Sequence, residues 1–128
     1  PDPEDPLDVL AKVGGLDIAG MCGLFLGGAA QRMPVVMDGF ISQVAALTAV
    51  RLVPECADYI LASHVSEEPG ANILLKALEK DAFLTCGMRL GEGSGAVALF
   101  PILDFASDIY HKMSTFVQAD IVEYQPLD

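Results

Sequence analysis

The chain has 128 residues, 52% of them hydrophobic, which allows one domain with a hydrophobic core and excludes a disordered segment. Its 18 acidic residues against 7 Lys and Arg give a net charge of −11, which disfavours binding to the phosphate backbone of a nucleic acid. The longest uncharged run, residues 18–31, is too short for a membrane-spanning helix, and the acidic, proline-rich start is unlike a secretory signal. We therefore expect a cytoplasmic protein with neither a membrane span nor a nucleic-acid partner.

Two helices are expected first. Residues 1–12 are expected to be a lead-in followed by a short helix. The helical pattern itself covers residues 8–15 and ends at a pair of glycines. Residues 16–33 have the length of a helix, with apolar residues on nearly every face. The four glycines of this segment would each cost about 1 kcal/mol relative to Ala. We therefore expect a fully buried helix that packs closely against a sheet or another helix.

The middle of the chain alternates between two patterns. Short apolar runs typical of buried strands cover residues 34–39, 58–63 and 82–87. Helical periodicity covers residues 40–53, 71–80 and 96–113, and residues 64–70 have the composition of a loop. Strands that alternate with helices pair in parallel with right-handed crossovers. The prediction is an α/β fold, a three-layer α/β/α Rossmann-like sheet, here a partial domain with about three strands and flanking helices.

The three cysteines, Cys22, Cys56 and Cys86, are widely spaced and form no Cys-x-x-Cys pair. This pattern indicates neither a zinc site nor a disulfide framework. Each cysteine lies in an apolar run, so we expect all three to be small buried hydrophobic residues in a reducing compartment. No metal site and no cofactor are predicted.

Polar residues follow the expected strands, at the sheet edge where ligands bind in parallel α/β folds. Asp38 ends the first strand, His64 and Ser66 follow the second, and Arg89 and Glu92 follow the third. Each has a structural alternative. Asp38 would cap the helix that follows it, His64 would be a loop or packed histidine, and Ser66 would begin the next helix. Arg89 would be a surface charge or pair with Glu92.

The loop GMRLGEGSG, residues 87–95, presents one carboxylate among glycines. Gly91 and Gly93 flank Glu92, and Gly95 follows where the last helix must begin. Glycines allow positive φ angles and close approach to a ligand, and backbone amides at a helix start can bind an anion. The alternative is a tight turn with a solvated Glu. The loop is neither a nucleophile elbow nor a P-loop.

Four segments in this order resemble the carboxyl-terminal part of the nicotinate-nucleotide:dimethylbenzimidazole phosphoribosyltransferases. They are VGGLDIAGMCGLFLGGA (13–29), PVVMDGFIS (34–42), ASHVSEEPG (62–70) and GMRLGEGSGAVALFPIL (87–103). The resemblance runs over residues 13–116 and leaves residues 117–128 as a tail. It implies a parallel Rossmann-like α/β domain with a small helical domain, usually in a homodimer.

The resemblance also implies a reaction. A phosphoribosyl group moves from nicotinate mononucleotide to a nitrogen of 5,6-dimethylbenzimidazole, and nicotinate leaves. The product, with inverted configuration, is α-ribazole 5′-phosphate, part of the lower ligand of cobalamin. Glu92 is implied as the general base, a role that suits a partly buried carboxylate. Leu90 and Gly91 are implied to border the base pocket, and Ser66 to contact the nucleotide, with Gly93 and Asp38 as further substrate-binding residues.

The family's chains are close to three times as long as this one, and their amino-terminal half carries another nucleotide-binding segment and much of the base pocket. We therefore expect this chain to act as a homodimer or to need the missing amino-terminal half. The alternative is a non-catalytic module that dimerises and binds a nucleotide or a partner protein. The apolar segment 16–33, which needs covering, favours this alternative.

Overall fold

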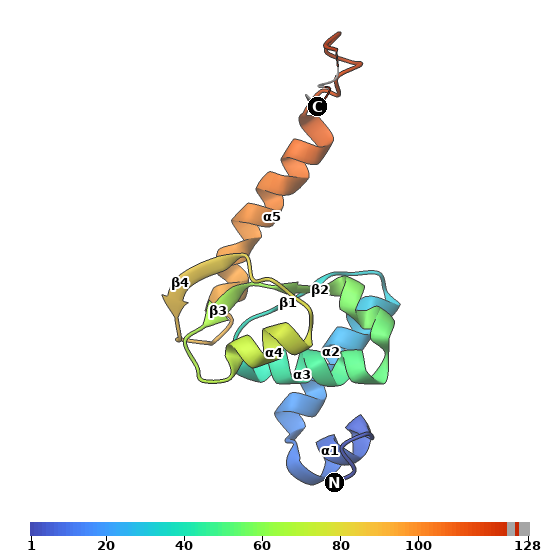
Figure 1. The fold of residues 1–128 in the computed structure, drawn as a ribbon, viewed down its shortest axis with the longest axis vertical. Helices are drawn as coiled ribbons and strands as arrows, with labels where there is room; N and C mark the ends of the chain where they lie inside the picture. Colours follow the sequence, from blue (N-terminus) through green and yellow to red (C-terminus); the bar gives the residue numbers. More distant parts are fainter. Residues whose placement is uncertain (123–124, 126–128) are drawn as a thin grey trace.

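The computed structural model describes residues 1–122 and 125. Its elements, in chain order (Figure 1), are α1 (Pro6–Val13), α2 (Leu16–Ala30), β1 (Val35–Met37), α3 (Phe40–Leu52), the 3₁₀ helix η1 (Pro54–Tyr59), β2 (Ile60–Ala62), β3 (His64–Ser66), α4 (Ala71–Ala77), β4 (Leu84–Met88) and α5 (Ser94–Lys112). The predicted α/β class, with short strands between helices, is confirmed. The 3₁₀ helix was not predicted, and it begins at the proline that ends α3. The predicted tail includes residues 123–124 and 126–128, which lie outside the described residues.

The strands pair in parallel, as predicted. β1 pairs with β2 in the register Val35 to Ile60, and β3 pairs with β4 in the register His64 to Leu84. Ser63 joins the two pairs: its N–H donates to the carbonyl of Met37 (3.2 Å), and its own carbonyl accepts from the N–H of Leu84 (3.0 Å). The segment from Ile60 to Ser66 therefore pairs with β1 along its first half and with β4 along its second half.

The prediction of a loop over residues 64–70 is wrong for its first three residues, which form β3. This segment has the loop composition HVSEEPG, but His64 and Ser66 are buried. The reason is tertiary: β4 lies alongside and takes up the backbone hydrogen bonds, so pairing overrides local composition. As a result, His64 and Ser66 sit on a paired strand.

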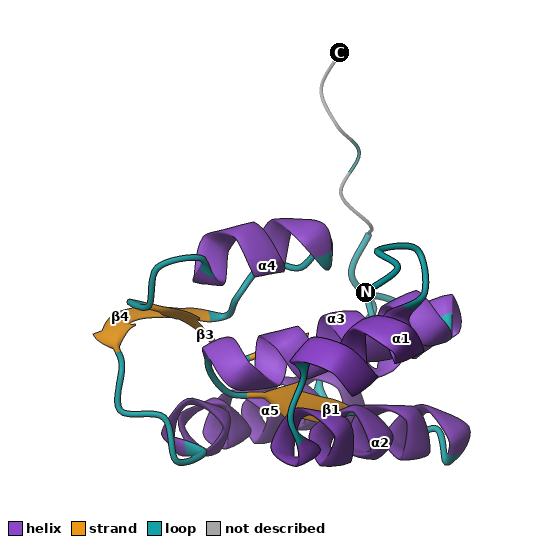
Figure 2. Ribbon diagram, turned by 90° about the horizontal axis from the view of Figure 1, so that it is seen from below, coloured by secondary structure: helices purple, strands orange, loops and turns teal. Residues whose placement is uncertain are grey.

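Helices cover the strands on both sides. Figure 2 shows α4 on one side of β3 and β4, and α5 on the other. Next to β1, α2 packs against α3 and η1. Small and medium side chains of these elements form the core, including Phe25, Met37, Ala46, Ile60 and Leu75. Within the described residues, no helix has both the length and the apolar character that a membrane span requires.

The first helix begins two residues earlier than predicted. The Asp5 carboxylate accepts hydrogen bonds from the N–H groups of Leu7 (3.0 Å) and Asp8 (3.2 Å), and Pro6 occupies the first helical position. Aspartate at the N-cap and proline next to it are both favourable at a helix start. Residues 1–5 thus form the lead-in and its cap.

The prediction that the second helix is fully buried is wrong. In α2 only Cys22 and Phe25 are buried, while Leu16 is 94% exposed and Leu24 is 66% exposed. Three of its glycines face open space, with no atom within 4 Å of an added Cβ: Gly20, Gly23 and Gly27. Gly28 alone packs tightly, against Val35. An apolar composition indicates that a helix has apolar surface to bury, but it does not indicate which residues pack against that surface.

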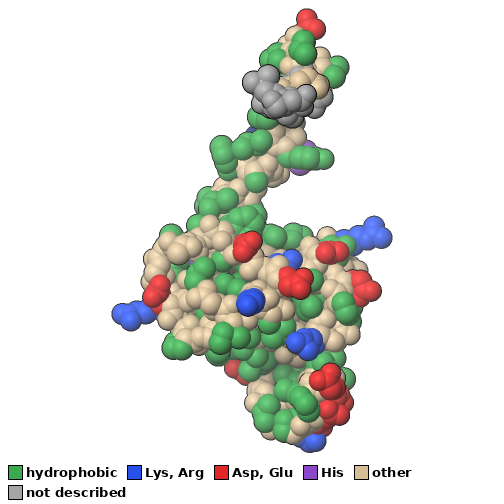
Figure 3. All heavy atoms as spheres, in the orientation of Figure 1, with side chains coloured by type: hydrophobic (Ala, Val, Ile, Leu, Met, Phe, Trp, Pro, Cys, Tyr) green, Lys and Arg blue, Asp and Glu red, His purple; other side chains and the backbone are tan. Residues whose placement is uncertain are grey.

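The last helix leaves the body of the molecule after its first turns. Leu99 is buried, whereas every residue from Asp104 to Lys112 is exposed. Figure 3 shows this half of α5 as a projecting arm with hydrophobic side chains on its surface. These include Phe105, which is 67% exposed, and Tyr110, which is 84% exposed. The helix runs through Pro101 without interruption.

The cysteines do not share one environment. Cys22 and Cys56 are buried, as predicted, and the thiol of Cys56 donates to the carbonyl of Phe25 (3.3 Å). Burial raises the pKa of both thiols, and the proximity of Cys22 raises the pKa of Cys56 further. The prediction is wrong for Cys86, which is exposed on β4.

Candidate functional site

A cavity of about 520 Å³ lies at the carboxyl ends of the strands, and this volume is within the range of small-molecule sites. All six residues predicted to form the site line it: Asp38, Ser66, Leu90, Gly91, Glu92 and Gly93. The strand exits therefore share one edge, as expected from parallel pairing. The roles of the individual residues remain predictions. A second hollow of about 510 Å³, between α1 and α2, has only Leu, Ala and Gly residues in its lining.

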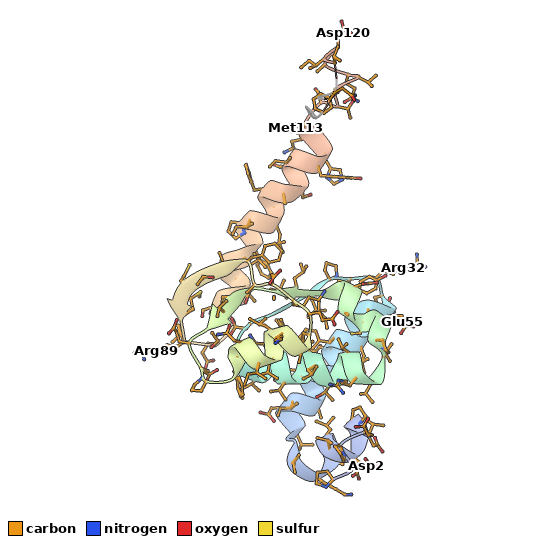
Figure 4. All side chains as sticks on the ribbon, in the orientation of Figure 1. Asp2, Arg32, Glu55, Arg89, Met113 and Asp120 are labelled. Carbon is orange, nitrogen blue, oxygen red and sulfur yellow. The ribbon has the colours of Figure 1, made fainter. Side chains whose placement is uncertain are left out.

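The cavity has an apolar wall and a polar rim. The wall consists of side chains from α2, β1 and the start of α3: Met21, Leu24, Phe25, Val35, Val36, Phe40 and Ile41. Leu90, on the opposite loop, also lines the cavity and is 76% exposed. The charged lining residues are Asp38, Glu68, Arg89 and Glu92. Arg89 is exposed and points away from the body (Figure 4), and it forms no ion pair with Glu92.

Glu92 lies on a turn of three consecutive left-handed residues. The φ angles are 74° at Gly91, 56° at Glu92 and 77° at Gly93. Glycine adopts this conformation freely, whereas for Glu92 it costs about 1 kcal/mol. The flanking glycines thus have the positive φ angles that their pattern indicated. The side chain of Glu92 is exposed, and the described residues do not supply the partial burial that the prediction included.

Asp38 occupies the N-terminus of α5. Its Oδ1 accepts from the N–H groups of Gly95 (2.7 Å) and Ala96 (3.2 Å), and its Oδ2 accepts from the N–H of Gly93 (3.1 Å). The expected anion site on these amides is therefore filled by a carboxylate of the chain itself. The N–H of Ser94 is also occupied, because it donates to the carbonyl of Gly91 (3.0 Å).

The structural alternative for Asp38 was a cap on the helix that follows it, and this alternative is wrong about which helix is capped. Gly39 is the N-cap of α3, and Asp38 caps α5 instead. Two serines fix the backbone of Asp38. The Asp38 N–H donates to Oγ of Ser42 (2.8 Å), and the hydroxyl of Ser63 donates to the Asp38 carbonyl (3.1 Å). The exit of β1 is thus held from both sides.

His64 is 2% exposed and lines the cavity beside Asp38. Its Nδ1 lies 2.9 Å from Oγ of Ser63 and 4.0 Å from Oδ1 of Asp38. Ser63 has one hydroxyl proton for two acceptors, the Asp38 carbonyl and Nδ1 of His64. When that proton goes to the carbonyl, Nδ1 carries a proton and donates to Ser63.

Gly95 has no side chain for a steric reason. A Cβ at this position would collide with the ring of His64 and approach Oδ1 of Asp38 to 2.8 Å. Glycine therefore lets α5 begin directly on the His64 ring, within reach of the Asp38 carboxylate. The sequence pattern indicated a ligand contact at this glycine. The structure shows a contact within the chain.

Ser66 lies at the end of β3 and is 5% exposed. Its Oγ accepts from the N–H of Glu68 (3.4 Å) and donates to the Glu68 carboxylate (3.5 Å). The alternative that Ser66 begins the next helix is wrong, because Gly70 is the N-cap of α4. Ser66 and Glu68 thus form one polar unit on the cavity rim.

Sequence reasoning gave little weight to three residues of this network: Ser42, Ser63 and His64. Ser42 follows Asp38 by four residues, a spacing that could have indicated a local hydrogen bond to its backbone. The contact of His64 with α5 joins segments far apart in the chain, and no local signal predicts it. Within the described residues, no group of three or more His, Cys, Asp or Glu side chains is arranged to hold a metal ion.

Comparison with known proteins adds the family. A family model described as phosphoribosyltransferase matches residues 1–121. A nicotinate-nucleotide–dimethylbenzimidazole phosphoribosyltransferase of Ruminiclostridium cellulolyticum is 55% identical over 128 residues, which are 100% of this chain and 36% of the relative. The protein of the same name from Acetivibrio thermocellus is 50% identical over 126 residues, 98% of this chain and 36% of the relative.

Two crystal structures from Thermus thermophilus have the same fold over nearly the whole chain. One is titled as the same phosphoribosyltransferase, with 39% identity and a TM-score of 0.86 over 93% of this chain. The other is titled CobT, with 37% identity and a TM-score of 0.88 over 97% of this chain. The chain covers 36% and 37% of these structures, respectively.

The chain thus spans about a third of the length of the relatives that it matches. Its position in the carboxyl-terminal part of the family sequence stays a prediction. Because the family model covers all but the last residues of the chain, the assignment does not depend on a single motif. The chain belongs to the phosphoribosyltransferase family.

Proposed function

We propose that this chain supplies the part of a phosphoribosyltransferase that carries the general base. The whole enzyme would transfer the phosphoribosyl group of nicotinate mononucleotide to 5,6-dimethylbenzimidazole. The observation that carries this proposal is the turn at Glu92, whose exposed carboxylate stands on the rim of a cavity with an apolar wall. The names of the relatives support the choice of substrates.

In the proposed reaction, the unprotonated nitrogen of the benzimidazole attacks C1′ of the ribose. The bond from C1′ to the nicotinate nitrogen breaks, and its electron pair leaves with nicotinate. The new C1′–N bond forms on the opposite face, which gives α-ribazole 5′-phosphate. Glu92 takes the proton from the other benzimidazole nitrogen, so the product base is neutral. The apolar wall, with Phe25 and Phe40, would hold the flat base.

The remaining predicted residues receive secondary roles. We propose that Leu90 and Gly91 border the base and that Ser66 and Gly93 face the nucleotide, since all four line the same cavity. We further propose that the site lies in a cytoplasmic enzyme, in a Rossmann-like domain, and is completed by a segment of the longer family chain or by a second copy. The exposed side chain of Leu90 supports the need for completion.

The test is a chimera in which residues 1–128 replace the matching segment of the Ruminiclostridium cellulolyticum relative, which is 55% identical over that length. With nicotinate mononucleotide and dimethylbenzimidazole, the chimera should release nicotinate and α-ribazole 5′-phosphate in equal amounts. A folded chimera that releases neither product would contradict the proposal.

Glu92→Gln in the chimera tests the role of the carboxylate. We expect a loss of about 100- to 10,000-fold in kcat, the usual contribution of a general base. Glu79→Gln is the matched control, because Glu79 is also an exposed Glu in the left-handed region (φ 53°) and does not line the cavity. Full activity of the Glu92 variant would remove the base from the proposal.

A non-catalytic dimerisation module is the second candidate, favoured by the exposed apolar faces of α2 and α5. It predicts that the 128-residue chain dimerises and binds nicotinate mononucleotide, whereas its chimera shows no turnover. Sedimentation and calorimetry on the chain, together with the activity of the chimera, separate the two candidates.

A further inference from the structure

Three backbone amides that follow Glu92 share one acceptor. The N–H groups of Gly93, Gly95 and Ala96 all donate to the Asp38 carboxylate, over distances of 2.7–3.2 Å. Asp38 lies 55 to 58 residues earlier in the chain, at the exit of β1. We propose that Asp38 is a positioning residue that holds the Glu92 turn in place, and does not itself bind the substrate.

The turn needs an external hold. Gly91, Glu92 and Gly93 all have positive φ angles, and a left-handed backbone is unfavourable for a residue with a side chain, such as Glu92. The only backbone hydrogen bond closing the turn within the described residues runs from the N–H of Ser94 to the carbonyl of Gly91. The Asp38 carboxylate adds a bond directly after Glu92 and two more in the first turn of α5.

The carboxylate of Asp38 has little capacity left for a ligand. Both of its oxygens already accept hydrogen bonds from amides, and the side chain is 16% exposed. A positively polarised helix N-terminus also favours this negative charge at its present position. Three of the roughly four lone-pair positions of the carboxylate are occupied, which leaves a substrate hydroxyl only the remaining position, on Oδ2.

Asp38 is itself held in place. Ser42 and Ser63 bind its backbone, and the ring of His64 packs behind its carboxylate. Gly95 leaves the space that this arrangement needs. Through Asp38, the turn that carries Glu92 is therefore tied to the end of β1 and to the buried ring of His64. For this reason we assign to Asp38 the role of positioning the general base. This proposal rests on the proposed function of Glu92.

The first experiment needs no activity. Amide hydrogen exchange is measured by NMR on the 128-residue chain with Asp38→Asn and Asp38→Ala. We expect the amides of Gly95 and Ala96 to exchange about 10-fold faster in the Asn variant and about 100-fold faster in the Ala variant, because hydrogen bonds to a charged acceptor are the strong ones. Asp58→Asn, at an exposed position on η1, is the matched control and should change neither rate. Unchanged exchange in both Asp38 variants would overturn the proposal.

The second experiment is a double-mutant cycle in the chimera. Asp38→Asn should lower kcat by about 10-fold or more and leave the KM for nicotinate mononucleotide unchanged, because the placement of Glu92 is lost and substrate contacts remain. In the Glu92→Gln background, Asp38→Asn should have no further effect on kcat. A purely structural role for Asp38 would lower kcat by the same factor in both backgrounds.

The outcomes separate the two proposals. A raised KM with multiplicative losses in kcat shows that Asp38 contacts the substrate, which overturns the positioning role while Glu92 keeps its own. Full activity of the Glu92→Gln chimera removes both the base and the positioning role. The exchange rates then still report whether Asp38 holds the first turn of α5.

Discussion

Two helices of this chain begin on an aspartate carboxylate, and the two aspartates differ in their distance along the sequence. In α1 the carboxylate of Asp5 accepts from amides two and three residues later, on an exposed surface. In α5 the carboxylate of Asp38 accepts from amides 55 to 58 residues later, next to a buried histidine. The first contact sets where one helix starts. The second joins a strand, a helix and the turn that carries Glu92.

The difference shows what a helix cap can do beyond stabilising a helix. A local cap satisfies amides that water would otherwise satisfy, so its removal affects one helix end. A remote cap fixes the position of one element relative to another. At the cavity, the remote cap holds the turn of Glu92, which lines the same cavity as the apolar wall, and the proposed reaction depends on this arrangement.

Removal of the remote cap should have the largest effect on stability. Asp38→Ala leaves the amide of Gly93 and two amides of the first turn of α5 without their acceptor, and we expect the free energy of unfolding to fall by about 3 kcal/mol. Urea denaturation of the chain measures this loss. Asp58→Ala, on the surface of η1, should stay within about 0.5 kcal/mol of the parent chain. Equal losses in the free energy of unfolding for Asp38→Ala and Asp58→Ala would show that the hydrogen bonds of Asp38 to α5 do not stabilise the fold.

The space beside the remote cap is the next point to test. Gly95→Ala forces a Cβ into the ring of His64 and toward Asp38, and we expect a loss of about 2 kcal/mol in the free energy of unfolding. Gly20→Ala is the matched control in α2, where an added Cβ meets no atom within 4 Å. It should instead raise stability by about 0.5–1 kcal/mol, because Ala is the better helix former. A stable Gly95→Ala chain would mean that His64 can move away.

The sequence allowed the class of fold and the edge of the site to be predicted, because both follow from local patterns. Apolar runs marked β1, β2 and β4, though not β3, and parallel pairing brought Asp38, Ser66 and Glu92 to one cavity. The left-handed turn was also predictable, since glycines flank Glu92.

The role of Asp38 was not predictable in the same way. Its partners on α5 are 55 to 58 residues away, and the pattern of Asp followed by a helix indicated a local cap instead. The exposed face of α2 was missed for a related reason. Its composition demands burial, but the described residues cover only the side of Cys22 and Phe25. In both cases the environment of a residue is set by parts of the protein that are distant in sequence.

Removal of the local cap should cost less than removal of the remote one. Asp5→Ala deprives α1 of the acceptor for the amides of Leu7 and Asp8, and we expect a loss of about 1 kcal/mol in the free energy of unfolding. Asp5→Asn, which keeps an acceptor oxygen, should lose only a fraction of this. A loss as large as that of Asp38→Ala would mean that local and remote caps do not differ in consequence.

The smallest effect belongs to the exposed pair in α1. A hydrogen bond from Lys12 and a second from the backbone N–H of Asp2 lower the pKa of Asp8 below its ordinary value. A carboxylate with a lowered pKa in the folded state adds stability above its unfolded pKa, and this stability is lost as the pH falls through the folded value. The stability difference between the parent chain and Asp8→Asn should therefore be present at neutral pH and shrink below about pH 4.

Denaturation at several pH values measures this difference, and high salt should reduce it because the pair of Asp8 and Lys12 is exposed. A difference that stays constant down to the acid limit would instead assign the effect of Asp8 to its shape at the helix start.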